Sequence, residues 1–114
     1  MSLVLNTGAY PPLLETRRLI LEHAGHVVIT KAEESEIALV CQGYPFDVAV
    51  IGQSAPPHAK RRIFRLVRRH CSAKILELIT PDSGKALEAA DGWLEVHPMQ
   101  ADLLARRVDE LARR

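Results

Sequence analysis

The order of the apolar segments constrains the fold of this chain more than any other feature of its sequence. Five short runs of aliphatic and β-branched residues alternate with longer stretches of helical character. Most of these runs are continuously apolar, which is typical of parallel strands that are covered on both faces. Strands joined through helices by short connections form right-handed crossovers, so the pattern predicts an α/β fold with a parallel sheet. The predicted strands are Leu3–Leu5, Val27–Ile29, Val48–Ile51, Ile75–Ile79 and the more amphipathic Trp93–Val96.

Helix start and stop signals indicate four helices between and after these strands. A proline pair opens the first helix, and Gly25 and Gly43 follow the first and the second. The connection over residues 80–91 is weaker, because only residues 85–90 have helical character, with at most two turns. The predicted helices are 12–24, 33–42, 59–71 and 101–112.

The length of 114 residues fits one domain that spans residues 1–114. Five strand units at this length favour the flavodoxin-like strand order 2-1-3-4-5. We therefore expect a three-layer sandwich in which the fourth helix, the one between the fourth and fifth strands (residues 85–90), is shortened. No glycine-rich phosphate loop follows a strand, which argues against a nucleotide-binding fold.

Four segments, spread over nearly the whole chain, carry a resemblance to a known family. They are Leu13–Val28, Pro45–Ile51, Pro56 with Arg65 and Arg68 in the helix after it, and His97–Pro98 with Asp102–Leu104. In this order and spacing they resemble a response-regulator receiver domain, the input module of two-component signalling. Each segment alone is a weak signal, and their combination is more specific.

The resemblance implies a phosphoryl-transfer site at the carboxyl ends of the strands. In the family, an aspartate after the third strand accepts the phosphoryl group, and an acidic pair after the first strand holds Mg²⁺. Here the acceptor position falls on Gly52, which has no nucleophile. The acidic pair falls on Gly8 and Ala9, or on Asn6 and Thr7 if the register slips.

The positions that sense the phosphoryl group in the family also differ in this chain. The lysine position holds His97, and the serine or threonine position falls on Leu78, with Thr80 two residues later as an imperfect candidate. The shortened fourth helix implies a reshaped surface where receivers often form their dimer or output face.

No carboxylate is placed to replace the missing acidic groups. The first in the chain is Glu15, inside a predicted helix, and none occurs between Asp47 and Glu77. Asp47 lies at the opposite end of the third strand, about 16 Å from Gly52 at ~3.3 Å per residue. We therefore expect a degenerate receiver (a pseudo-receiver) with no catalytic residue, no metal site, no cofactor and no Mg²⁺-dependent phosphorylation.

The expected function is protein–protein interaction in two-component signalling, through a homodimer or a signalling partner. The alternative is a small-molecule or anion sensor that uses a polar remnant of the pocket, lined by Asn6, Thr80 and His97. An enzyme is not expected, because no nucleophile–base pair or cofactor loop is recognisable. The longest apolar run is Ile37–Cys41, too short to cross a membrane. With no secretion signal visible, we expect a cytoplasmic domain.

One predicted helix concentrates positive charge. Six of the fifteen lysine and arginine residues fall within ten positions of it. This pattern predicts docking to an acidic protein or a phosphate group, or else a solvated face opposite Ile63, Phe64 and Val67. The net charge of +1 and the single basic helix argue against DNA binding. The six residues are Lys60, Arg61, Arg62, Arg65, Arg68 and Arg69.

Glu77 interrupts a predicted inner strand. A buried carboxylate without a partner is costly or becomes protonated. We therefore expect Glu77 to lie near a rim in contact with solvent, or else to pair with His97 or another base.

Overall fold

A computed structural model describes residues 2–96 and 100–114 of the chain. Its elements are β1 (Leu3–Thr7), α1 (Pro11–His23), β2 (Val27–Lys31), α2 (Glu34–Gly43), β3 (Val48–Ile51), α3 (Pro57–His70), β4 (Lys74–Ile79), β5 (Gly92–Glu95) and α4 (Ala101–Ala112). The five strands are parallel and lie in the order β2-β1-β3-β4-β5. This confirms the predicted α/β, flavodoxin-like fold class.

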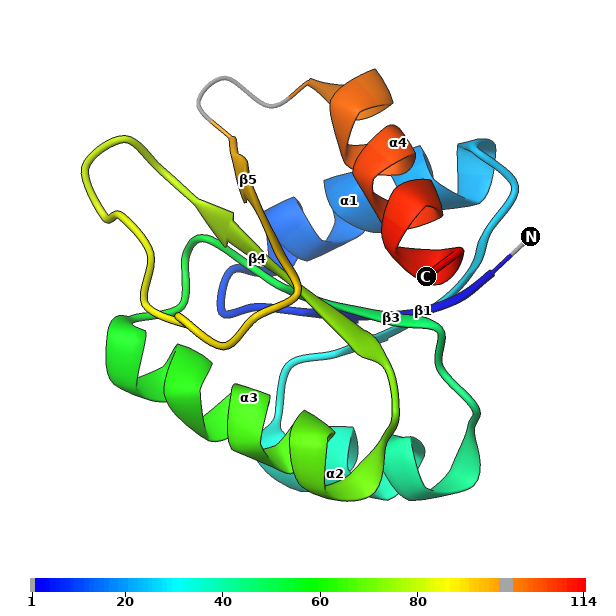
Figure 1. Cartoon of the computed structure of the whole chain (residues 1–114), viewed down its shortest axis with the longest axis vertical. Helices are drawn as coiled ribbons and strands as arrows, with labels where there is room; N and C mark the ends of the chain where they lie inside the picture. Colours follow the sequence, from blue (N-terminus) through cyan, green and yellow to red (C-terminus); the bar gives the residue numbers. More distant parts are fainter. Residues whose placement is uncertain (1, 97–99) are drawn as a thin grey trace.

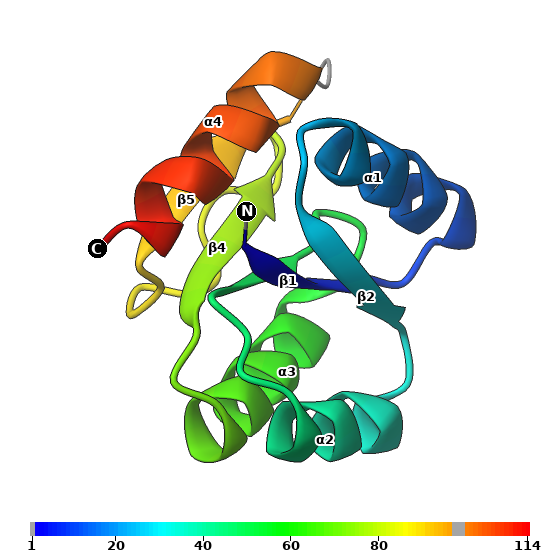
Figure 2. The ribbon, with the colours of Figure 1, turned by 90° about the vertical axis from the view of Figure 1, so that its right-hand side faces the viewer.

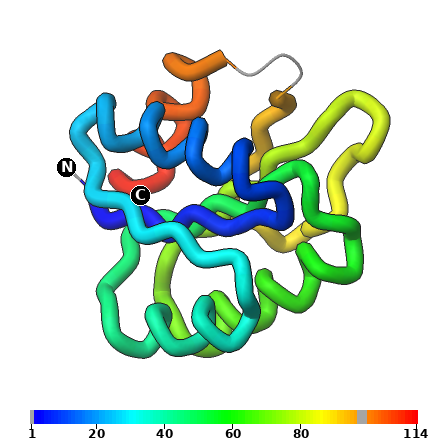
Figure 3. Tube along the Cα trace, turned by 180° about the vertical axis from the view of Figure 1, so that it is seen from behind, coloured from blue at the N-terminus to red at the C-terminus, as the bar shows by residue number. Residues whose placement is uncertain are grey.

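The helices form a layer on each face of the sheet. Helices α1 and α4 cover one face, and α2 and α3 cover the other (Figures 1 and 2). The view from behind shows the same two layers (Figure 3). Each of the four helices begins and ends within two residues of its predicted bounds.

The sheet separates two apolar cores, and alternate residues of β3 supply both. Ala49 and Ile51 pack in the core beneath α2 and α3, whereas Val48 and Val50 pack in the core beneath α1 and α4. All four residues of β3 are buried. This two-sided burial is the reason why the inner strands read as continuous apolar runs rather than as alternating ones.

The connection between β4 and β5, residues 80–91, contains no helix in the structure. The expected short helix over residues 85–90 is therefore wrong, and the connection consists of turns. Gly84 has a left-handed backbone with φ of 64°, and six residues are too few to offset the nucleation of an isolated helix. In addition, the backbone N–H groups of Ala86 and Leu87 donate to the side chain of Glu77 rather than to helical carbonyl groups.

A buried ion pair fixes this connection to the sheet. The carboxylate of Glu77 lies 2.9 Å from Nζ of Lys60 and accepts hydrogen bonds from the backbone N–H groups of Ala86 and Leu87, each at 3.0 Å. Lys60 Nζ also donates to the carbonyl oxygen of Leu78 at 2.9 Å. The pair therefore joins α3, β4 and the connection, and it satisfies backbone groups that a helix would have used.

Two expectations from the sequence are corrected by this pair. Glu77 is completely buried rather than solvated at a rim, and its partner is Lys60. His97, the partner considered from the sequence, lies outside the described residues. Lys60 is only 2% exposed, so it does not belong to the exposed basic surface. The reason is that Lys60 faces the sheet from α3, where a buried carboxylate requires a cation.

Removing the cation of this pair is expected to destabilise the fold strongly. The substitution Lys60→Met keeps the apolar stem and leaves the Glu77 carboxylate buried without its counter-charge, which typically lowers the free energy of unfolding by about 3–5 kcal/mol. The matched control, Arg61→Met, changes an exposed neighbour and is expected to shift the free energy of unfolding by less than about 0.5 kcal/mol. Urea unfolding measures both. Equal stability of the two variants would contradict the ion pair.

Candidate functional site

The carboxyl ends of β1 and β3 meet at the middle of the sheet, where the chain reverses its winding direction. In open α/β sheets this is the position at which ligands bind. Thr7 pairs with Ile51, and the N–H of Gly52 donates to the carbonyl oxygen of Thr7 at 3.0 Å. Gly8 lies beside Gly52, since a Cβ added to Gly8 would come within 3.7 Å of the Gly52 Cα. The two glycines singled out in the sequence are thus neighbours.

The guanidinium of Arg17, from α1, fills the space between these strand ends. Its Nη1 donates to Oδ1 of Asn6 at 2.8 Å and to the carbonyl oxygen of Thr7 at 2.9 Å. Its Nη2 donates to Oε1 of Gln53 at 3.1 Å. The side chain of Arg17 therefore connects α1 to the ends of both central strands.

The polar side chains at the end of β1 are engaged in further internal hydrogen bonds. Asn6 Nδ2 donates to the carbonyl oxygen of Leu14 at 2.9 Å and to Oγ1 of Thr30 at 3.1 Å. Thr7 Oγ1 donates to the carbonyl oxygen of Val50 at 2.8 Å. Asn6, Thr7 and Arg17 are each 0% exposed, so these three side chains are closed to solvent, whereas Thr30 and Gln53 are partly exposed.

Arg17 is a buried cation with only neutral acceptors. Within residues 2–96 and 100–114 it forms no ion pair, and its Nε has no hydrogen-bond partner. Burial lowers the pKa of Arg17 to about 10, so the group is still protonated at neutral pH. The strand ends therefore carry one positive charge. A buried charge without a counter-charge is held at a cost of several kcal/mol, which the three hydrogen bonds offset in part.

Sequence reasoning missed Arg17, although one signal was present. Leu14, Arg17 and Leu21 are spaced three and four residues apart, and all three are buried on one side of α1. An arginine on the apolar side of a helix requires acceptors inside the fold. The sequence does not reveal that Asn6 and Gln53 supply them, because this depends on how α1 lies across the strands.

The position of Gly52 is too crowded for a side chain. A Cβ added there would lie 2.8 Å from Nη2 of Arg17 and 2.9 Å from the carbonyl oxygen of Thr7. Gly8 is less restricted, with its nearest contact 3.3 Å from Leu14 Cδ2, and Ala9 is exposed ahead of α1. Gly52 is therefore required for packing as well as lacking a nucleophile.

Two of the predicted sensing positions, Leu78 and Thr80, do not join this cluster. Leu78 is completely buried in the core beneath α1 and α4. Thr80 closes a local turn, because its N–H donates to Oγ of Ser83 at 3.0 Å and its Oγ1 accepts the N–H of Ser83 at 3.2 Å. His97 lies outside the described residues. Asn6 and Thr80 are thus engaged with different segments and do not form a shared polar pocket.

Two kinds of feature are absent from the described part of the chain. It holds no cluster of three or more histidine, cysteine, aspartate or glutamate side chains that could bind a metal ion. None of its helices is both long and apolar enough for a membrane span.

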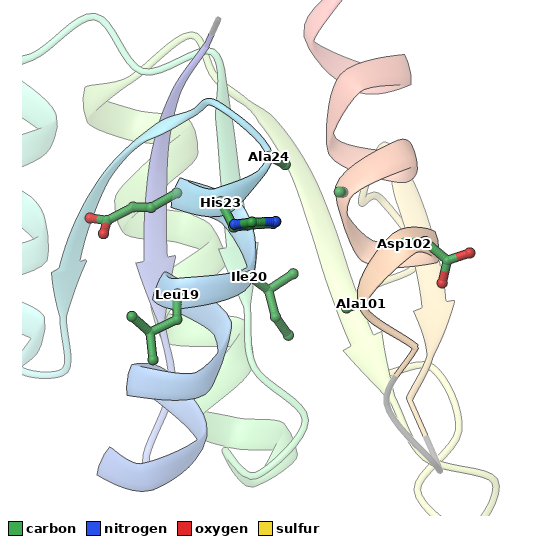
Figure 4. Close-up of a pocket in the computed structure, with 8 residues that line it drawn as sticks. Leu19, Ile20, His23, Ala24, Ala101 and Asp102 are labelled. Carbon is green, nitrogen blue, oxygen red and sulfur yellow. The ribbon is translucent and has the colours of Figure 1, made fainter.

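A separate groove of about 870 Å³ lies between α1 and α4 (Figure 4). Its lining is mainly apolar, with Leu19 exposed by 54%. No polar network like that around Arg17 converges on it among the described residues, so the groove is suited to apolar contact. The labelled residues are Leu19, Ile20, His23, Ala24, Ala101 and Asp102.

Solved structures of known proteins match the fold of this chain, although sequence comparisons do not. No protein-family model matches the chain, and no curated protein matches it. The receiver domain of the Francisella response regulator 1452 matches with a TM-score of 0.81 and 19% identity, covering 99% of this chain and 98% of that one. The response regulator TrrA of Thermotoga maritima, solved with Mg²⁺-BeF, matches with a TM-score of 0.79 and 20% identity, covering 97% and 99%.

A structure of the histidine kinase ThkA in complex with TrrA matches equally well, with a TM-score of 0.79, 20% identity and coverage of 97% and 98%. The chain therefore has the fold of a response-regulator receiver domain over nearly its whole length. At these identities the likeness concerns the fold.

Crowding at Gly52 predicts a clear contrast between two glycines. The substitution Gly52→Ala forces its Cβ against the backbone of Thr7 and against Arg17, and is expected to lower the free energy of unfolding by about 1–3 kcal/mol. The control Gly43→Ala, at the end of α2, meets no atom within 4 Å and is expected to leave stability unchanged or slightly higher. Chemical denaturation distinguishes the two, and a tolerated alanine at position 52 would contradict the packing.

The hydrogen bonds of Arg17 predict a similar contrast between neighbouring arginines. The substitution Arg17→Lys keeps the charge but loses the planar group that reaches Asn6, Thr7 and Gln53 together, and is expected to lower the free energy of unfolding by about 2 kcal/mol. Arg18→Lys, which alters a half-buried surface residue paired with Glu15 and Glu22, is expected to change the free energy of unfolding by less than about 0.5 kcal/mol. Thermal unfolding compares both, and similar losses would argue against the network.

Proposed function

We propose that this chain is a receiver-like module of two-component signalling that acts through protein contact, without Mg²⁺-dependent aspartyl phosphorylation. The receiver fold supports the signalling role. The observation that supports the absence of phosphorylation is the buried guanidinium of Arg17, which lies at ends of β1 and β3 that carry no carboxylate.

The chemistry of phosphorylation requires groups that this site lacks. An aspartyl phosphate forms on a carboxylate, and Mg²⁺ prefers carboxylate oxygens as ligands. In our assignment the acceptor position is Gly52 and the acidic-pair positions are Gly8 and Ala9. The nearest carboxylates in the sequence point elsewhere. Asp47 accepts the N–H of Leu3 at 2.8 Å at the opposite strand ends, and Glu15 pairs with Arg18 on the surface.

The charge of the site also opposes a metal ion. Arg17 is protonated at neutral pH, and a buried cation repels a divalent cation strongly in a low-dielectric environment. Its hydrogen bonds already connect α1 to β1 and to the segment after β3. We infer that these bonds hold the strand ends in one arrangement, so that the module presents a constant surface to its partner.

A signalling protein or a second copy of the chain is the proposed class of partner. TrrA, which shares this fold, forms a complex with the histidine kinase ThkA. The apolar groove between α1 and α4 supports a contact of this kind here. A cytoplasmic location and a non-enzymatic role are parts of the same proposal. A ligand sensor at the strand ends is less favoured, because Asn6, Thr7 and Arg17 are closed to solvent.

Binding of a phosphoryl mimic provides the test. Beryllofluoride with Mg²⁺ is expected to leave the melting temperature of this protein unchanged, because the site offers no carboxylate to either group. TrrA, whose structure contains Mg²⁺-BeF, is the positive control in the same buffer. A Mg²⁺-dependent rise in melting temperature, or a phosphoryl adduct in the mass spectrum after incubation with acetyl phosphate, would overturn the proposal.

A further inference from the structure

The outer side of α3 carries five exposed arginines, Arg61, Arg62, Arg65, Arg68 and Arg69, which we call the arginine face. The one lysine of the helix, Lys60, points inward to Glu77, as do the apolar residues Ile63 and Val67 toward the core. The 14 residues of α3 include no aspartate or glutamate, so no carboxylate of the helix itself balances this charge.

Two of the five arginines bond to neighbouring elements. Arg62 Nε donates to Oε2 of Glu34 in α2 at 2.8 Å. Arg68 Nη2 donates to Oδ2 of Asp91 at 3.0 Å, and the Arg68 guanidinium lies 5.0 Å from the ring centre of Phe64. These contacts join the two flanks of α3 to the rest of the fold.

The other three arginines, Arg61, Arg65 and Arg69, form no ion pair within the described residues. They repeat at every fourth position, so they form a stripe along one side of the helix, with backbone positions about 6 Å apart at ~1.5 Å rise per residue. Like charges at this spacing destabilise a helix slightly. Within the stripe, Arg69 lies in the last turn, where positive charge favours the helix dipole. The stability of α3 therefore explains Arg69 but not the repeat of Arg61 and Arg65 before it.

A shallow apolar hollow of about 210 Å³ lies on each side of Arg65. The first is formed between Phe64 of α3 and residues 86–89 of the β4–β5 connection, with Glu88 among its lining. The second is formed around Leu66, with Glu34 at its edge. Each hollow is large enough for an apolar side chain, so the stripe combines cationic groups with small apolar contacts.

We propose that Arg61, Arg65 and Arg69 form a docking site for an acidic, amphipathic helical segment of a protein partner. Guanidinium groups bind carboxylates through paired hydrogen bonds, and carboxylates at every fourth position of a partner helix have the same spacing as the stripe. Leucine-sized side chains of the partner would fill the hollows. The site lies on the face of the sheet opposite α1 and the groove between α1 and α4 (Figure 2).

The surroundings of the stripe favour a short acidic segment over a nucleic acid. Helix α2 lies beside α3, and its first turn carries Glu34 and Glu36, with Glu33 immediately before it. A long phosphate backbone that crossed the arginine face would meet these carboxylates. A peptide segment confined to the stripe would meet only Glu34 among them, whose charge is already paired with Arg62. The net charge of +1 provides no general attraction for a polyanion.

The test uses the full chain and a labelled synthetic helical peptide, with glutamate at every fourth position and leucine beside it. Fluorescence anisotropy is expected to show saturable binding that weakens about tenfold in the triple variant Arg61→Gln, Arg65→Gln, Arg69→Gln. The matched control, Arg106→Gln, Arg113→Gln, Arg114→Gln, removes the same charge from the carboxyl-terminal end and is expected to bind like the wild type. Circular dichroism verifies that both variants are folded.

Several outcomes would overturn the proposal. They are equal binding by the two triple variants, equal binding of a peptide with glutamine in place of glutamate, and tighter binding of a duplex DNA oligonucleotide than of the acidic peptide. Self-association that is lost only in the α3 variant, measured by sedimentation, would instead make a second copy the occupant.

The inference rests on the proposed function only in that the module acts by protein contact. Its failure would leave the beryllofluoride result unaffected, so the two can be judged separately.

Discussion

The guanidinium of Arg17 is the interaction on which the centre of this molecule depends. It joins α1 to the ends of the two central strands, and every acceptor that it uses is neutral. The absence of a side chain at Gly52, the orientation of Asn6 and the closure of the strand ends all follow from the space and the hydrogen bonds that this one group takes. A receiver fold is thus built around an internal cation at the position where such folds bind ligands.

The chain buries a second cation in a different manner. Lys60 meets a carboxylate, Glu77, which also binds two backbone N–H groups of the β4–β5 connection. That arrangement compensates the charge and replaces the hydrogen bonds that a helix between β4 and β5 would have formed. Arg17 has no such compensation. One buried cation therefore secures a connection without a helix, and the other occupies the site itself.

The strands, their order and four helices could be predicted from the sequence, because continuous apolar runs report burial on both faces of a sheet. The locations of Gly8 and Gly52 followed from the ends of those runs. The partners of the buried charges could not be predicted. Lys60 stands in the sequence as one of a run of basic residues, and nothing in that run shows that it faces the sheet while Arg61 faces solvent. That direction, and the contact with Glu77, depend on how α3 lies against β4. Local spacing therefore predicts the elements, whereas the polar contacts between layers require the packed structure.

The crowding at Gly52 has a consequence for how this sequence can change. An aspartate at position 52 has no room while Arg17 is in place, since even a Cβ would touch its guanidinium. Removing Arg17 first would leave Oδ1 of Asn6 buried without a donor and the carbonyl oxygen of Thr7 with the N–H of Gly52 alone. Each route to an acidic strand end thus passes through a less stable intermediate. The residues at positions 17 and 52 are therefore coupled, because an acidic side chain at position 52 requires a compensating change at Arg17.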